Sequence, residues 1–285
     1  MEVSAKSLVL DLLSTMRRGS MPVSLLVRAA EAFGIDQNGL RVAVARLLAR
    51  GLIERDERGH YRLGRGAAST MTRVAAWRSL GDATRAWSGQ WIAVHTAAVP
   101  RAERAALRRT QRVLRLFSFK TIAPDLEIRP DNLALGLDEL RTELGELGAD
   151  ARAVSFTLSS FDADRERRAR MLWNVRELSA GYRRSLAVLA DSRRRLPQLD
   201  EEAAMVESFI VGGSILRQLV HDPLLPEQLL AGDERRALIE AMKEYDEIGR
   251  ACWAPFMQHH GISVRKTPGR LGTVVAAQSP APANA

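Results

Sequence analysis

The pattern of apolar and polar positions over the first 66 residues predicts three helices. Apolar side chains recur at helical spacing within residues 7–17, 22–33 and 37–50. Asp36 is well placed to cap the third helix, and Gly51 to end it. The side chains expected to face the core are Leu8, Val9, Leu12, Leu13, Met16, Leu26, Ala29, Ala30, Phe33, Leu40, Val44, Leu47 and Leu48.

Two short strands are expected after these helices. Residues 52–55 and 60–63 would pair across the polar turn at residues 56–59. Pro22 falls in the first turn of the second helix, where its missing N–H costs nothing. Helix, turn, helix and two strands in this order predict a winged helix-turn-helix, which binds DNA. The alternative is an amphipathic helical hairpin with a polar solvated face and a chance β-ribbon.

The outer face of the third helix carries the candidate DNA-reading residues. Arginines and an asparagine among small side chains, at i, i+3 and i+4 spacing, suit a helix that enters the major groove. The expected contacts from this helix are Gln37, Asn38, Arg41, Val42, Ala45 and Arg46. On the wing, near the DNA backbone or the minor groove, they are Arg55, Arg58 and His60.

Strand and helix patterns alternate in the middle of the chain. The expected strands cover residues 90–95, 119–123, 126–129 and 153–158, and the helices cover residues 102–117 and 135–147. Pro124 and Asp125 would turn the hairpin between the second and third strands. The resulting order βαββαβ is that of a ferredoxin-like fold.

The rest of the chain is expected to be helical. The predicted helices cover residues 165–190, 201–220, 226–230 and 235–258. The whole is an α+β chain with these predicted parts: a winged helix-turn-helix at 1–66, a linker with a connecting helix at 67–86, a ferredoxin-like domain at 87–160, an all-helical domain at 161–260 and a disordered tail at 261–285.

Net charge and cysteine content indicate which kind of partner the protein binds and in which cellular compartment it acts. The 285 residues carry a net charge of +8, which favours an anionic partner. The single Cys252 excludes an internal disulfide and fits a reducing cytosol. The N-terminus lacks the pattern of a signal peptide, and charged residues are expected to interrupt every apolar run, so that no segment spans a membrane. We therefore expect a cytoplasmic protein.

Arginines gather near apolar residues in two places. The helix at residues 102–117 carries a stripe made of Arg101, Arg104, Arg108, Arg112 and Arg115. Such a stripe is usually a solvated face, and contact with DNA phosphates or an anionic ligand is the alternative. Residues 165–195 interleave Trp173 and Tyr182 with arginines. These two aromatic residues fit either the core, which is the commoner role, or the lining of an aryl-acyl pocket.

Four segments together resemble a known family. They are Phe33-Gly-Ile-Asp through Gly51-Leu-Ile, Trp87-Ser-Gly-Gln-Trp-Ile-Ala-Val, residues 119–130, and Asp222-Pro-Leu-Leu-Pro. In this order the chain resembles PaaX-type transcriptional repressors, which control phenylacetate catabolism in bacteria. The resemblance implies a winged domain, a central ferredoxin-like domain of the type seen in CRISPR-adaptation nucleases, and a helical C-terminal domain. It also implies a dimer that blocks promoters until an aryl-acyl-CoA thioester releases it.

A CoA thioester places its own demands on a site. It carries several phosphate charges and an apolar acyl end, so it needs cations beside an apolar cleft. The candidate effector-binding residues are Arg104, Arg108, Trp173, Tyr182, Arg193, Arg194 and Arg195. The region at residues 165–195 is preferred, because a helical domain without other chemistry needs a reason for so many cations.

An enzyme is not expected. The related nucleases hold a metal with an aspartate at the end of the first strand, where this chain has His95 and Thr96. Neither Asp125 nor Asp131 replaces that aspartate by spacing. No nucleophile elbow, phosphate loop or Cys/His cluster appears, so the sequence predicts no catalytic residue, cofactor or metal.

The sequence thus predicts a sequence-specific regulator that represses a catabolic operon. Its expected partners are double-stranded operator DNA, an aryl- or acyl-CoA thioester effector and a second copy of the chain. The operator of such a dimer would be pseudo-palindromic. The alternative is a non-regulatory interaction module that uses the winged domain for protein contact. The basic outer face at residues 37–50 counts against it.

Overall fold

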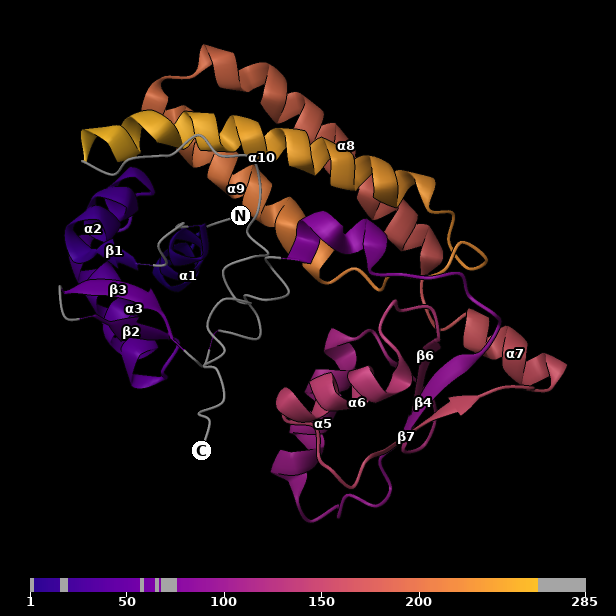
Figure 1. Ribbon diagram of the computed structural model, residues 1–285. Coiled ribbons are helices and arrows are strands. Elements are labelled where there is room, and N and C mark those ends of the chain that lie inside the picture. Colours follow the sequence, from indigo (N-terminus) through magenta and orange to yellow (C-terminus); the bar gives the residue numbers. More distant parts are fainter. Residues whose placement is uncertain (1–2, 16–19, 57–58, 65–66, 68–75, 261–285) are drawn as a thin grey trace, which may run out of the picture. The chain divides into compact units, whose positions relative to one another are not determined.

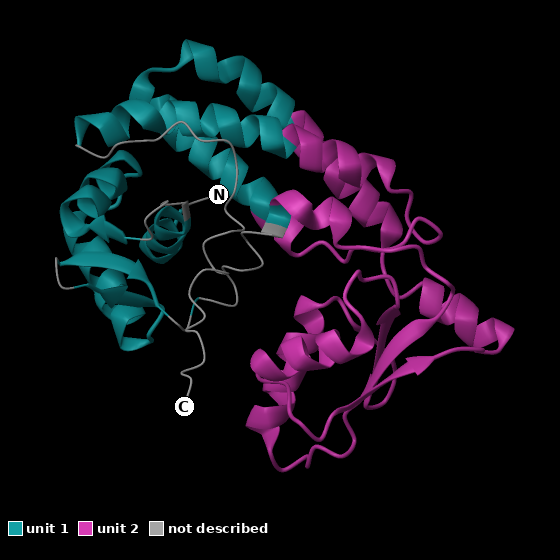
Figure 2. Cartoon of the chain, in the orientation of Figure 1, with its two compact units in different colours: residues 1–77, 188–216, 242–285 teal, residues 78–187, 217–241 magenta. Residues whose placement is uncertain are grey.

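The computed structural model is an α+β structure that describes residues 3–15, 20–56, 59–64, 67 and 76–260 (Figure 1). The chain forms two compact units (Figure 2). Unit 1 comprises residues 1–77, 188–216 and 242–285, and unit 2 comprises residues 78–187 and 217–241. Neither unit is a continuous stretch of chain, and the predicted division into five consecutive parts stays a prediction. The predicted tail lies outside the described residues.

The predicted helices and paired strands of the N-terminal region are present, with one strand more. The elements are α1 (Ala5–Thr15), β1 (Ser20–Pro22), α2 (Val23–Ala32), α3 (Gln37–Ala49), β2 (Ile53–Arg55) and β3 (His60–Leu63). The strands form an antiparallel sheet in the order β1-β3-β2. Pro22 ends β1 and is the extended N-cap of α2 (φ −66°, ψ 147°), so its placement in the first helical turn was wrong. Pairing of the buried Met21 with Tyr61 holds this stretch in the sheet.

The turn before α3 and the end of α3 follow the prediction. The Asp36 side chain accepts a hydrogen bond from the backbone N–H of Gly39 at 2.8 Å, which satisfies one of the free amides of the first turn. Gly34 and Gly51 have left-handed backbone angles, with φ of +69° and +63°. Glycine adopts this conformation without a Cβ clash, so Gly34 can form the turn after α2 and Gly51 can follow the end of α3.

The core beneath α3 includes side chains from the end of the chain. Buried apolar residues of α1, α2 and α3 form one cluster with Met257. Phe209, Trp253 and Phe256 pack against that cluster. The ring centroids of Phe33 and Phe209 lie 5.1 Å apart in an edge-to-face contact, and Trp253 stacks on Phe33 at 6.4 Å. The N-terminal core is therefore completed by side chains that come more than 140 residues later.

The central region has the predicted order βαββαβ. Its elements are β4 (Trp91–His95), α5 (Arg104–Leu116), β5 (Lys120–Ala123), β6 (Leu126–Pro130), α6 (Leu137–Glu146) and β7 (Val154–Leu158). The strands form an antiparallel sheet in the order β5-β6-β4-β7. Ile92 and Val94 of β4 join the apolar sides of α5 and α6 in one buried cluster. A 3₁₀ helix, η2 (Ala76–Asp82), precedes the sheet.

The helical region departs from prediction in two places. Its elements are α7 (Ala163–Arg170), α8 (Val175–Arg195), the 3₁₀ helix η3 (Leu196–Gln198), α9 (Glu201–Val220) and α10 (Asp233–His259). The single helix expected at residues 165–190 is two helices, because Trp173 between them is buried against the sheet. The helix expected at residues 226–230 is a turn. Leu225 and Leu230 are buried there in non-helical backbone.

The expectation that charged residues interrupt every long apolar run is wrong for helix α9. Within the described residues it is long and apolar enough to cross a membrane, with a mean hydropathy of 1.3 over 18 residues. Met205, Val211, Ile215 and Leu219 are nevertheless buried against other parts of the protein. A Cβ added at Gly212 would lie 3.6 Å from the side chains of Met242 and Tyr245. These contacts are those of a partly buried core helix.

One carboxyl group in the central sheet is buried without a full set of partners. Glu127 of β6 is 9% exposed, and its Oε2 has no hydrogen-bond partner among the residues that the structure describes. It pairs across the sheet with Val94 on one side and Thr121 on the other. Desolvation raises the pKa of Glu127 above its ordinary value of 4.5, and the neighbouring Asp125 carboxylate raises it further.

We expect Met257→Ala to destabilise the protein by about 2–5 kcal/mol, because it leaves a cavity in the core beneath α3. Urea unfolding followed by fluorescence of the tryptophans measures the change. Gln258→Ala, at an exposed position of the same helix, is the control and should leave the midpoint within experimental error. A variant as stable as the parent would show that α10 does not support this core.

Glu127→Gln should make the protein more stable at neutral pH. The pKa of this carboxyl group is higher in the folded state than in the unfolded state. Its contribution to stability is therefore fully present below the unfolded pKa and is lost as the pH rises through the folded pKa. The gain from glutamine should therefore be present at pH 7 and should disappear below about pH 4.5. Thermal melts from pH 4 to pH 8, with Glu146→Gln at an exposed position as the control, measure it. A gain that is equal at every pH would contradict this origin.

Candidate nucleic-acid interface

Helix α3 separates its residues into two faces as the sequence predicted. Leu40, Val44 and Leu47 are buried in the core of unit 1. The residues expected to contact DNA from this helix are all exposed: Gln37, Asn38, Arg41, Val42, Ala45 and Arg46. The outer face thus consists of polar, basic and small side chains, and even Val42 is 42% exposed.

Within the described part of the chain, the arginines of the outer face are not used in ion pairs. Arg41, Arg46 and Arg50 have no carboxylate partner among the residues that the structure describes. The helix itself contains no acidic residue. By contrast, Arg28 on the neighbouring α2 pairs with Glu31 at 3.1 Å. The cations of α3 are therefore available to an anionic partner.

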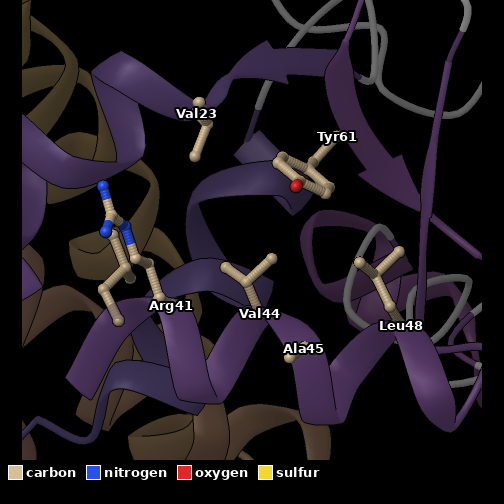
Figure 3. A pocket seen from close by; sticks show the side chains of 7 residues that line it. Val23, Arg41, Val44, Ala45, Leu48 and Tyr61 are labelled. Carbon is tan, nitrogen blue, oxygen red and sulfur yellow. The ribbon is translucent and has the colours of Figure 1, made fainter. Parts of the chain in front are cut away.

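A shallow apolar hollow lies beside Arg41. It has a volume of about 150 Å³. Figure 3 shows Val44 pointing from α3 toward Val23 and Tyr61, with Arg41 at one side. The hollow is lined by Val23, Leu40, Arg41, Val44, Ala45, Leu48 and Tyr61. Val23 and Tyr61 could not be identified from the sequence, because no helical period links the start of α2 or a strand to the face of α3.

The turn between β2 and β3 is held by Asp56. Its side chain accepts a hydrogen bond from the backbone N–H of His60 at 2.8 Å, and Gly59 has a left-handed φ of +77°. Arg55 is exposed at the end of β2, whereas His60 is half-buried. Arg58, the third expected contact of the wing, lies outside the described residues. Arg55 thus remains as an exposed cation at the described edge of this turn.

The two aromatic effector candidates are core residues with hydrogen-bond partners. The Trp173 indole N–H donates to the backbone oxygen of Ser118 at 3.1 Å, and its ring stacks on Trp91 at 6.1 Å. The Tyr182 hydroxyl donates to Asp222 at 2.6 Å. Burial and the Asp222 carboxylate raise the pKa of Tyr182. These positions favour the core alternative over a pocket lining.

The cationic effector candidates are divided between the two units. Arg193, Arg194 and Arg195 belong to unit 1 and pair with Glu244, Asp191 and Glu207, respectively. Arg104 and Arg108 belong to unit 2, where they are exposed on α5. Trp173 and Tyr182 also belong to unit 2, but they are buried.

The end of β4 has no metal-binding arrangement in the described part of the chain. His95 is exposed at this end, and Asp125 pairs with Arg101 at 3.3 Å. Among the described residues, no group of three or more His, Cys, Asp or Glu side chains could hold a metal ion. The aspartate that would hold a metal at the end of the first strand is thus not replaced by such a group among the residues that the structure describes.

Comparison with known proteins finds two family models and a solved structure. The model "PaaX-like protein" matches residues 4–66, and "PaaX-like protein C-terminal domain" matches residues 173–254. A structure described as uncharacterized protein Rv0674 from Mycobacterium tuberculosis is 26% identical. The match covers 87% of this chain and 98% of that chain, with a TM-score of 0.55. No curated protein matches the chain.

Proposed function

The chain belongs to the PaaX-like family, and we propose that it is a transcriptional regulator that binds double-stranded operator DNA through α3 and the β2–β3 wing. The observation that carries this proposal is the outer face of α3. Its basic and amide side chains are exposed, and its arginines have no carboxylate partner in the described part of the chain. A helix of this composition fits the major groove, where base edges present donors and acceptors.

The side chains of α3 match the chemistry of base edges. An arginine can donate two hydrogen bonds to guanine O6 and N7, and an asparagine can pair with adenine N6 and N7. In the proposal, Arg41, Arg46 and Asn38 make these contacts or position the helix on the phosphates. Val42 and Ala45 are small, so the helix can approach the bases closely. Gln37 lies in the first turn and would contact the edge of the same groove.

The hollow beside Arg41 suggests a preference at one base pair. Its lining is largely apolar, and it lies next to a side chain that can bind guanine. The C5 methyl group of thymine is the apolar feature of the major groove. We propose that a thymine methyl group enters between Ala45 and Val44 when Arg41 contacts a neighbouring guanine.

The wing contacts, the dimer, the regulated operon and the effector are proposed from the resemblance of the sequence to PaaX-type repressors. Arg55, Arg58 and His60 would contact the backbone or the minor groove from the wing. The protein would act in the cytoplasm as a homodimer on a pseudo-palindromic operator and would repress a catabolic operon. An aryl- or acyl-CoA thioester would be the effector.

The competing proposal is an interaction module whose winged region binds protein. A protein interface is rich in aromatic and apolar side chains at its centre. The outer face of α3 has exposed arginines and no acid, and its hollow is small. This composition favours nucleic acid.

We expect Arg41→Ala to weaken operator binding by about 1–3 kcal/mol and to relax sequence preference, because a bidentate base contact is lost. Folding should be unaffected, since the side chain is exposed. Fluorescence anisotropy at fixed salt, with a duplex that covers the DNA upstream of the protein's own gene, measures the change.

The control for Arg41→Ala removes the same charge elsewhere. Arg184 is exposed and pairs with Glu177 at 2.6 Å, so Arg184→Ala should leave operator affinity nearly unchanged. If Arg41→Ala binds the operator as tightly as the parent, Arg41 does not read a base. If the parent binds no duplex at all, the proposed function itself is wrong.

The effector prediction can be tested by calorimetry with phenylacetyl-CoA. For these arginines to bind the CoA phosphates, they must leave their carboxylate partners Glu244, Asp191 and Glu207. Under this proposal, replacing Arg193, Arg194 and Arg195 together by alanine weakens binding about tenfold or more, because charge-assisted hydrogen bonds to phosphate are lost. Operator binding should remain. Arg104→Ala/Arg108→Ala tests the other group of cations. If neither variant changes the affinity, or the parent binds no acyl-CoA, both candidate sites are wrong.

A further inference from the structure

Helix α5 carries an exposed row of arginines on the side away from its core. The row consists of Arg104, Arg108, Arg112 and Arg115, all of which are exposed. The opposite side of the helix is buried through Ala106, Thr110, Val113 and Leu114. The helix contains no acidic residue between its first and last positions. We call these four side chains the arginine row.

Folding does not explain the arginine row. Like charges at i, i+4 spacing destabilise a helix, and this spacing occurs between Arg104 and Arg108 and between Arg108 and Arg112. The helix dipole favours a cation in the last turn, which accounts for Arg115. The same dipole disfavours a cation at Arg104, the first residue of α5. The row therefore carries an electrostatic cost that a bound anion would offset.

The four side chains have no partner among the described residues. Two arginines beside the row do have structural contacts. The Arg109 Nε donates to the backbone oxygen of Gly148 at 2.8 Å, and Arg101 pairs with Asp125. Most exposed arginines of the helical region are paired with acids, for example Arg165 with Asp162, Arg167 with Asp164, Arg183 with Glu234, Arg184 with Glu177, and Arg236 with Glu227. On α5, four neighbouring cations have no carboxylate partner in the part of the chain that the structure describes.

The shape of the row selects the kind of anion. Arg104 and Arg115 are eleven residues apart in the sequence, which corresponds to about 16 Å along the helix axis. A small phosphate ligand is bound in a concave site by groups that converge on it, whereas these guanidinium groups lie along one side of a solvent-facing helix. Duplex DNA presents a continuous line of phosphates with about one negative charge per 1.7 Å of axis. The row fits such an extended polyanion.

We propose that the arginine row of α5 binds the phosphate backbone of duplex DNA. Unit 2 would then add affinity that does not depend on sequence, while α3 in unit 1 reads the operator. This inference rests on the proposed function, because it assigns a second contact to the same partner.

The test is the salt dependence of DNA binding by the full-length protein. The variant replaces Arg104, Arg108, Arg112 and Arg115 by glutamine, which removes the charges and has a helical preference close to that of arginine. Dissociation constants are measured between 50 and 300 mM salt on the upstream duplex and on an unrelated duplex of equal length. Each phosphate contact that is lost lowers the slope of log K against log salt by about 0.9, so we expect a decrease of about 3 to 4.

The affinity for both duplexes should fall by the same factor, at least tenfold at the lowest salt, because phosphate contacts do not read sequence. The matched control replaces Arg165, Arg167, Arg184 and Arg236, four paired arginines of unit 2, by glutamine. It removes the same net charge and should change the slope by less than 1. Circular dichroism melts verify that both variants fold.

The possible outcomes are distinguishable. An α5 variant whose slope changes no more than that of the control overturns the inference, and the proposed function stands. Loss of phenylacetyl-CoA binding with unchanged DNA binding also overturns it, because the row would then be an effector site. A parent that binds neither duplex overturns both the inference and the proposed function.

Discussion

The contact of Phe33 with Phe209 and Trp253 is the interaction on which the candidate DNA-reading face depends. Helix α3 is short, and isolated helices of this length are marginal in water. Its exposed arginines add no apolar burial, so its stability comes from the opposite face. That face lies on a core to which α10 contributes Met257. A face that is rich in unpaired charge is thus held in place by apolar contacts from the far end of the chain.

Local features of this fold could be predicted from the sequence. Helix α3 and its Asp36 cap follow the pattern closely, because a cap and a helical period are properties of neighbouring residues. The additional strand β1 and the break before α8 could not be predicted in this way. Both depend on partners far along the chain: Met21 pairs with Tyr61, and Trp173 is held between Ser118 and Trp91.

The candidate site likewise has features that could be predicted from the local sequence and features that could not. Periodicity is sufficient to show that Arg41 and Leu40 point to opposite faces of a helix. It does not show which arginines are already paired, and this decides where positive charge is available. The run Arg193 to Arg195 is prominent in the sequence, yet each of its side chains has a carboxylate partner. The arginines of α5 have none among the described residues.

Trp253 and Met257 lie near the end of the chain, and this affects folding during synthesis on the ribosome. Residues 5–63 are translated long before α10 leaves the exit tunnel. Their apolar surface therefore stays exposed until the side chains of α10 can pack against it. Contacts between residues this far apart in sequence also carry a high loop-closure cost, which slows folding. The apolar side of the nascent N-terminal region is therefore incompletely covered until the last helix has been made.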